Sequence, residues 1–363
     1  LDGNMTSSDG GFTWDGSINR TLGMNLLGNT LTVTSGDISS NVAFDVLEND
    51  NIIVENVLLK NHTIPGEAAD DQSGYSVSLS SDGTIVAIGA PFNDGSGNAS
   101  GHVRVYQYSN NSWDQLGDDI DGEAANDQSS TSVSLSSDGT IVAIGAQLNY
   151  DNLYRSGHVR VYQYSNNSWV QLGSDIYGEA SSDRSGTSVS LSSDGTIVAI
   201  GAEYNDGNGN NSGHVRVYQY SNTSWQQLGD DIDGDAAYDK SGHAVSLSSD
   251  GTIVAIGTPN KNHVRVYQYI NNSWDQLGAD IDGEAAYDRS GSSVSLSSDG
   301  TIVAIGAPLN GSDGSKNGQV RVYQYSNNSW DQLGADIDGE ASDDWSGSSV
   351  SLSSDGTIVA IGA

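Results

Sequence analysis

The chain has 363 residues and a formal net charge of −34, from 47 acidic and 13 basic side chains, and it contains no cysteine. Such an acidic excess repels nucleic acids and anionic membranes, and the lack of cysteine excludes disulfides and thiolate metal sites. No apolar run approaches the roughly 20 residues of a membrane span. We therefore expect no nucleic-acid partner and no membrane insertion, and we interpret the chain as the mature form, or a portion, of a secreted protein.

Residues 1–65 differ from the rest of the chain, but they contain three strand-like runs, at residues 31–33, 42–47 and 52–59. Gly, Asn and Asp separate these runs, and their order mimics the repeat that follows. A hairpin alone is marginal in water, so these strands must pack on something. We predict a divergent N-terminal segment that forms a degenerate blade, with an arm of about 16 residues that reaches a neighbouring subunit.

From residue 66 onward a unit of mostly 56 residues repeats almost without change. A fixed period of this size indicates a solenoid, a propeller or an array. Near-identical copies also argue against a single catalytic centre. The repeats are bounded as 66–121, 122–177, 178–233, 234–282, 283–338 and, in part, 339–363. Each contains a Ser-Asp-Gly-Thr turn, whose aspartates are Asp82, Asp138, Asp194, Asp250, Asp299 and Asp355.

One repeat predicts four antiparallel strands. In the first copy, residues 75–80 alternate polar and apolar, as a half-buried strand does, and residues 84–90 are apolar on both faces. After a Gly-rich loop, residues 102–108 are β-branched and aromatic, and residues 113–120 form a fourth, outer strand. Four such strands in each unit predict an all-β propeller, because a blade must stack on its neighbours to bury both faces.

The number of blades stays open between seven and six. A degenerate N-terminal blade, five full repeats and the terminal hairpin at 339–363 make seven, which we favour. In the alternative, residues 42–59 complete the terminal hairpin and close a six-bladed ring. Either closure hides exposed strand edges.

Several motifs in each repeat resemble the FG-GAP-like repeats, which are related to the propeller of integrin α subunits. They include residues 112–116, 121–127 and 132–135, and the Gly-Ala-Pro element at residues 89–91 and 306–308. The Phe-Gly element departs from the family pattern and reads Ser-Gly in most copies, as at Ser73-Gly74. The resemblance covers residues 66–363. It implies a seven-bladed, extracellular, non-enzymatic interaction domain.

Members of that family often carry a calcium loop with several aspartates in the first hairpin. Here the hairpin has one carboxylate, Asp82, whereas calcium takes six to eight oxygen ligands, so we expect a plain turn. A second acidic set recurs near the blade junction. We favour a solvated surface without a cofactor there, and a calcium site is the alternative. The calcium candidates are Asp119, Asp121, Glu123, Asp127, Asp280, Asp282, Glu284 and Asp288.

One histidine and one arginine recur in each repeat. His102, His158, His214 and His263 occupy one position, and Gln319 replaces them in the fifth copy. We expect these side chains to pack or hydrogen-bond at a strand end. The recurring arginines should pair with carboxylates of the same or the adjacent blade.

Of the motifs in this chain, the Asn-x-Ser/Thr sequons are the strongest candidates for a functional role. They predict N-glycosylation in a secreted protein. Five of them repeat in the turn before the outer-strand tryptophan. The candidates are Asn4, Asn19, Asn61, Asn98, Asn110, Asn166, Asn210, Asn222, Asn271, Asn310 and Asn327.

Together these features predict a secreted or cell-surface β-propeller glycoprotein that is not an enzyme. The expected role is a structural building block of an extracellular filament, coat or matrix, and the alternative is an adhesion or carbohydrate-binding propeller. The expected partners are further copies of the chain, other extracellular proteins or glycans.

Overall fold

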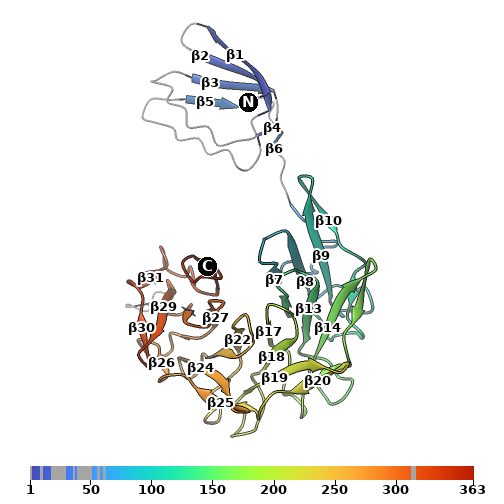
Figure 1. The fold of residues 1–363 in the computed structure, drawn as a ribbon, viewed down its shortest axis with the longest axis vertical. Helices are drawn as coiled ribbons and strands as arrows, with labels where there is room; N and C mark the ends of the chain where they lie inside the picture. The colour runs from blue at the N-terminus through green and yellow to red at the C-terminus, as the bar shows by residue number, and fades with distance from the viewer. Residues whose placement is uncertain are drawn as a thin grey trace. The chain divides into compact units, whose positions relative to one another are not determined.

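The computed structural model describes residues 63–311 and 316–363 in full, and before them the backbone of six strands. The chain divides into two compact units, Leu1–Ile64 and Pro65–Ala363, which are drawn in Figure 1. The strands of the first unit are β1 (Asp2–Ser8), β2 (Gly11–Ser17), β3 (Thr30–Ser35), β4 (Asp37–Ile38), β5 (Asn51–Val54) and β6 (Leu58–Leu59).

The first unit contains a four-stranded sheet in the order β1-β2-β3-β5. Strands β1 and β2 are antiparallel, whereas β2–β3 and β3–β5 are parallel pairs. The predicted run 31–33 lies in β3 and part of the run 52–59 lies in β5, and the run 42–47 lies outside the described residues. The degenerate blade and the inter-subunit arm stay predictions.

The second unit repeats one antiparallel sheet five times and ends in a two-stranded sheet. The innermost strands are β7 (Ser76–Leu79), β12 (Ser132–Leu135), β17 (Ser188–Leu191), β22 (Ala244–Leu247), β27 (Ser293–Leu296) and β32 (Ser349–Leu352). The second strands are β8 (Ile85–Ala90), β13 (Ile141–Ala146), β18 (Ile197–Ala202), β23 (Ile253–Thr258), β28 (Ile302–Ala307) and β33 (Val359–Gly362). The third strands are β9 (His102–Ser109), β14 (His158–Ser165), β19 (His214–Ser221), β24 (His263–Ile270) and β29 (Gln319–Ser326).

The outer edge of each blade consists of two short strands, where the sequence predicts one. The first of the two are β10 (Ser112–Gln115), β15 (Ser168–Gln171), β20 (Ser224–Gln227), β25 (Ser273–Gln276) and β30 (Ser329–Gln332). The second are β11 (Ile120–Asp121), β16 (Ile176–Tyr177), β21 (Ile232–Asp233), β26 (Ile281–Asp282) and β31 (Ile337–Asp338). Both pair with the third strand. The break contains a glycine with positive φ, such as Gly117 at 76°, a conformation that interrupts a strand.

The described part of the chain contains strands and no helix, and its blades follow one another around an arc (Figure 1). The prediction of an all-β propeller of four-stranded antiparallel blades is confirmed. The described residues include no helix that is long and apolar enough to cross a membrane.

Apolar clusters fill the boundary between consecutive blades. In one of them, Val159 and Val161 of the second blade pack with Val198 and Ile200 of the third. Small residues allow this approach: a Cβ on Gly139 would lie 2.7 Å from the Cδ1 of Ile85 in the preceding blade. The repeat therefore encodes one interface, which is used again at each boundary.

The first and last faces of the arc have no such partner among the described residues. Ile358 is 68% exposed, whereas Ile85 at the same repeat position is 8% exposed. Leu79 is 59% exposed, whereas Leu135 is 7% exposed. The tips of the inner hairpins surround a central cavity of about 660 Å³, lined mainly by leucine and serine. Asp355 is the one titratable residue among the described residues that line it.

Candidate functional site

The hairpin aspartates are turn residues. The Asp138 carboxylate accepts hydrogen bonds from the Ser136 hydroxyl at 2.7 Å and from the Thr140 N–H and hydroxyl at 3.0 and 2.8 Å. Burial acts to raise the pKa of Asp138, but these hydrogen bonds hold it below the ordinary value. The same bonds recur at Asp82 and Asp194, so the carboxylate closes the turn.

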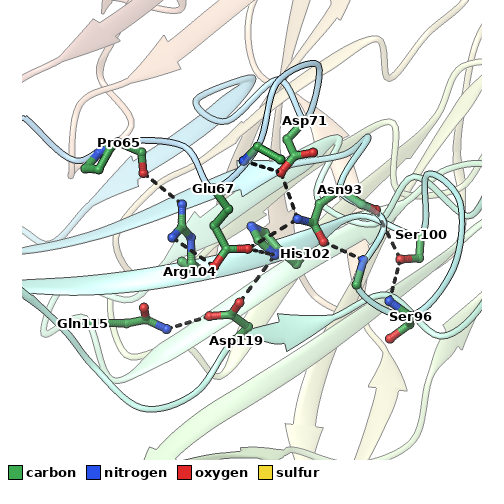
Figure 2. Close-up of polar contacts among 12 residues, drawn as sticks. Pro65, Glu67, Asp71, Asn93, Ser96, Ser100, His102, Arg104, Gln115 and Asp119 are labelled. Atoms are coloured by element: carbon green, nitrogen blue, oxygen red, sulfur yellow. Dashed lines mark hydrogen bonds and ion pairs between the residues drawn. The ribbon is translucent and has the colours of Figure 1, made fainter.

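In the first four blades a second group of carboxylates meets the recurring histidine and arginine, and we call each such group a boundary cluster. In the first blade it comprises Glu67, His102, Arg104 and Asp119 (Figure 2). The Nδ1 atom of His102 lies 3.6 Å from Asp119 Oδ2 and 3.8 Å from Glu67 Oε2. The Arg104 Nη1 lies 3.4 Å from Glu67 Oε1, and its Nη2 donates to the Pro65 carbonyl at 3.1 Å.

The next clusters repeat this arrangement. The arginines pair with carboxylates of the segment that leads out of the preceding blade, as predicted: Arg160 Nη1 lies 3.4 Å from Glu123 Oε1, and Arg216 Nη1 lies 3.2 Å from Glu179 Oε1. The same two arginines also donate to the Asp121 and Tyr177 carbonyls at 2.8 Å. Groups that could hold a metal ion are Glu67–His102–Asp119, Glu123–His158–Asp175, Glu179–His214–Asp231 and His263–Asp280–Asp282.

The structure divides each predicted calcium set between two boundaries. Asp119 lies with His102, whereas Glu123 lies with His158 of the next blade. Asp127 serves as a cap, because its carboxylate accepts hydrogen bonds from the Ala124 N–H at 3.1 Å and the Asn149 amide at 3.0 Å.

The second set is divided in the same way. Asp280 and Asp282 lie with His263, and Glu284 accepts a hydrogen bond from Gln319 at 3.3 Å. Asp288 caps like Asp127. Each of these clusters thus offers a metal ion one histidine nitrogen and two carboxylates. This set of ligands does not select calcium.

A further cluster occurs once in the described chain, and its residues depart from the repeat. We call it the Glu203 cluster: Arg184, Glu203, Tyr204, Lys240 and His243. Glu203 and Tyr204 directly follow β18, His243 directly precedes β22 of the next blade, and Lys240 lies three residues before His243. The Nδ1 atom of His243 lies 2.8 Å from Glu203 Oε2.

Two cations lie over one aromatic ring in this cluster. The Arg184 Cζ and the Lys240 Nζ are each 4.2 Å from the centre of the Tyr204 ring, within the range of cation–π attraction. The Lys240 ammonium also donates a hydrogen bond to the Tyr204 hydroxyl at 2.9 Å and lies 4.0 Å from Glu203. In a chain of net charge −34, this is a local concentration of positive charge.

Glu203 is 7% exposed. Burial acts to raise the pKa of its carboxyl, but the hydrogen bond and charge of His243 and the charges of Lys240 and Arg184 hold that pKa below the ordinary value. An ionised carboxylate can only accept, so Nδ1 of His243 carries the proton of this hydrogen bond, and in the neutral imidazole Nε2 carries the lone pair.

Reasoning from the repeat missed this cluster because it gave weight to recurring residues. At the position of Glu203 the other repeats have Gln147 or a proline, and at the position of His243 they have Thr, Tyr or Ser. In the preceding boundary, Thr187 donates to Gln147 at 3.2 Å, which is an uncharged version of the same contact. The usable signal was the departure from the repeat.

The sequons lie mostly on exposed turns. Asn110, with a φ of 48°, begins the turn between β9 and β10, and the equivalent Asn166, Asn222, Asn271 and Asn327 are also exposed. Asn98 and Asn210 are exposed, and Asn310 is half-buried. Asn4 lies in β1, and Asn19 and Asn61 lie outside the described residues. Glycosylation at these positions stays a prediction.

Comparisons with known proteins agree with the fold. The FG-GAP repeat family matches residues 65–106 and 178–218. The periplasmic gluconolactonase of Pseudomonas aeruginosa is similar over 74% of this chain and 72% of its own, with 18% identity and a TM-score of 0.51. A Bacteroides uniformis protein described as a candidate 6-phosphogluconolactonase covers 72% and 71%, with 14% identity and a TM-score of 0.51. Kuenenia stuttgartiensis hydrazine synthase covers 79% of both chains, with 15% identity and a TM-score of 0.52. A comparison with curated protein sequences found no match.

These neighbours correct the expectation of a non-enzymatic filament, coat or adhesion propeller. The prediction that the chain is not an enzyme was wrong, because it assumed that a repeated blade excludes a catalytic centre, whereas proteins named as lactonases share this architecture. Near-identical blades do not exclude a single site, since a few departures from the repeat can create one. One of these neighbours is named as periplasmic, so the fold occurs in an exported protein. The chain is a β-propeller, and residues 65–106 and 178–218 of its repeats match the FG-GAP repeat family.

Proposed function

We propose that this protein is an exported hydrolase of sugar lactones and that its active site is the Glu203 cluster. The single observation that carries the proposal is the 2.8 Å contact between His243 and the buried carboxylate of Glu203. A buried carboxylate that fixes one imidazole nitrogen leaves the other free to act as a general base. The names of the structural neighbours supply the substrate class.

The chemistry follows from the arrangement. The Nε2 atom of His243 accepts a proton from water, and the resulting hydroxide attacks the lactone carbonyl carbon. The negative charge that develops on the carbonyl oxygen is stabilised by the nearby ammonium and guanidinium groups of Lys240 and Arg184. When the intermediate collapses, the ring C–O bond breaks and His243 returns its proton to the leaving alkoxide. The product is the open-chain hydroxy acid.

The test measures acid release from glucono-δ-lactone with a pH indicator, above the spontaneous rate in buffer. We expect His243→Ala to lower kcat by roughly 10²- to 10⁴-fold, the usual contribution of a general base. Glu203→Gln should also lower kcat, because an amide can donate as well as accept and so does not hold the proton of His243 on Nδ1.

Thr187→Ala is the matched control, because Thr187 occupies the position of His243 one blade earlier. It should leave the rate unchanged. A wild-type rate equal to that of buffer, or a His243→Ala rate equal to that of the wild type, would show that this cluster is not a lactonase site.

A further inference from the structure

The boundary cluster of the second blade contains a buried nitrogen without a partner. His158 is 1% exposed, and its Nδ1 atom has no hydrogen-bond partner. A buried polar atom without a partner is costly and rare in folded proteins. Among the described boundaries, this occurs at the recurring Nδ1 of His158 alone.

That nitrogen lies beside a carboxylate of a group that could hold a metal ion. It lies 3.7 Å from Asp175 Oδ2, and the ligand atoms of Glu123, His158 and Asp175 all lie within 4.8 Å of one another. Ligand atoms around a tetrahedral ion with bonds of about 2 Å lie roughly 3.3 Å apart. A small inward movement of flexible carboxylates would therefore complete a coordination shell.

Two residues distinguish this boundary from its neighbours. Asp151, whose side chain lies next to that of Glu123, stands where the first and third repeats have glycine. Tyr177 stands where the other repeats have aspartate, and its hydroxyl donates to Asp175 Oδ2 at 2.9 Å. Gln171 donates to the other oxygen of Asp175 at 2.6 Å. Such contacts orient a ligating carboxylate.

The charges of the site also favour a cation. Glu123, Asp151 and Asp175 gather here, and the guanidinium of Arg160 lies 3.4 Å from Glu123 Oε1. One positive charge against three carboxylates leaves room for a divalent ion. The side chain of Glu123 is 37% exposed, which gives an ion a route from solvent.

We propose that the second boundary cluster binds a divalent transition-metal ion of the Zn²⁺ class through Nδ1 of His158 and the carboxylates of Glu123 and Asp175, with Asp151 as a further oxygen donor. Imidazole nitrogen with two or three carboxylates suits such an ion, whereas Ca²⁺ takes six to eight oxygen ligands. The proposal is independent of the lactonase site, which shares none of these residues.

At the fourth boundary the arginine binds the equivalent carboxylate directly. There Arg265 donates to Asp280 through Nε and Nη2, each at 2.8 Å, and also contacts Asp235. Both oxygens of Asp280 thus accept hydrogen bonds from Arg265, so this carboxylate is held away from an ion beside His263. This makes His263 the matched control for His158.

The experiment titrates the full chain, first freed of metal by a chelator, with ZnCl₂ in a calorimeter and with CoCl₂ by visible absorption. We expect a Zn²⁺ site and Co²⁺ d–d bands, both retained in 10-fold excess Ca²⁺. His158→Ala should weaken Zn²⁺ binding at least tenfold, roughly the loss on disturbing a metal's shell, and remove the bands. His263→Ala should leave both unchanged.

Glu123→Gln guards against misfolding, because its side chain is partly exposed, and circular dichroism confirms the fold of every variant. It should weaken binding as His158→Ala does. The proposal is overturned if the folded wild-type chain takes up no Zn²⁺. It is equally overturned if His158→Ala and Glu123→Gln bind as the wild type does, or if Ca²⁺ displaces the ion.

Discussion

A pair of glycine substitutions tests the interface between blades. Gly83 and Gly139 occupy the same turn position and have the same φ of 70°. A Cβ on Gly139 would lie 2.7 Å from Ile85 Cδ1 and 2.8 Å from Ile85 Cβ, whereas a Cβ on Gly83 would meet nothing within 4 Å among the described residues. The backbone strain of an alanine is therefore equal at both sites, and only the steric term differs.

The expected losses follow from these two terms. A left-handed conformation costs an alanine about 1–2 kcal/mol, so Gly83→Ala should lower the free energy of unfolding by that amount. Gly139→Ala adds an overpacked contact against the stiff Cβ of Ile85, worth about 1–3 kcal/mol. The second variant should therefore be less stable than the first by about 1–3 kcal/mol.

Urea unfolding provides the measurement, followed by circular dichroism and by tryptophan fluorescence so that coincident curves verify a single transition. Gly195→Ala repeats the experiment one blade later, since its Cβ would lie 2.7 Å from Ile141 Cδ1. Equal losses for Gly83→Ala and Gly139→Ala would refute the reasoning. They would mean that the first face is covered in solution, or that the boundary yields without cost.

Two further predictions concern bonds that recur in the repeat. Trp169→Phe removes the 2.7 Å hydrogen bond from its indole N–H to the Leu116 carbonyl of the preceding blade. It should lower the free energy of unfolding in urea by about 0.5–1.5 kcal/mol. The control Trp345→Phe, at a half-exposed ring, should lower it less, and the reverse order would count against the inter-blade bond. Burial acts to raise the pKa of Asp138, but its hydrogen bonds with Thr140 and Ser136 lower that pKa in the folded state. The ionised carboxylate therefore stabilises the fold above the unfolded-state pKa of about 4. This stabilisation is lost as the pH falls below that value toward the folded-state pKa. Asp138→Asn should therefore flatten the fall of stability between pH 4 and pH 2, and an unchanged acid profile would show that this carboxylate does not contribute.

The sequence by itself determined the architecture, because each strand type and turn is written in the repeat. The alternation of residues 76–79, the apolar run at residues 85–90 and the Asp-Gly turn specify a hairpin locally, and repetition of one interface forces the blades to stack. The sequence also predicted the ion pairs of the arginines and the role of the aspartates in the turns, because these contacts lie within one turn or across one blade boundary.

Only the tertiary structure decided which residues meet. Glu203 and His243 lie 40 positions apart and touch because one ends the second strand of a blade while the other begins the next blade. The same stacking separates Asp119 from Glu123, which are four positions apart, and places each with a different histidine. Sequence spacing measures distance along the chain, whereas contacts across a blade boundary depend on which strand ends the stacked sheets bring together.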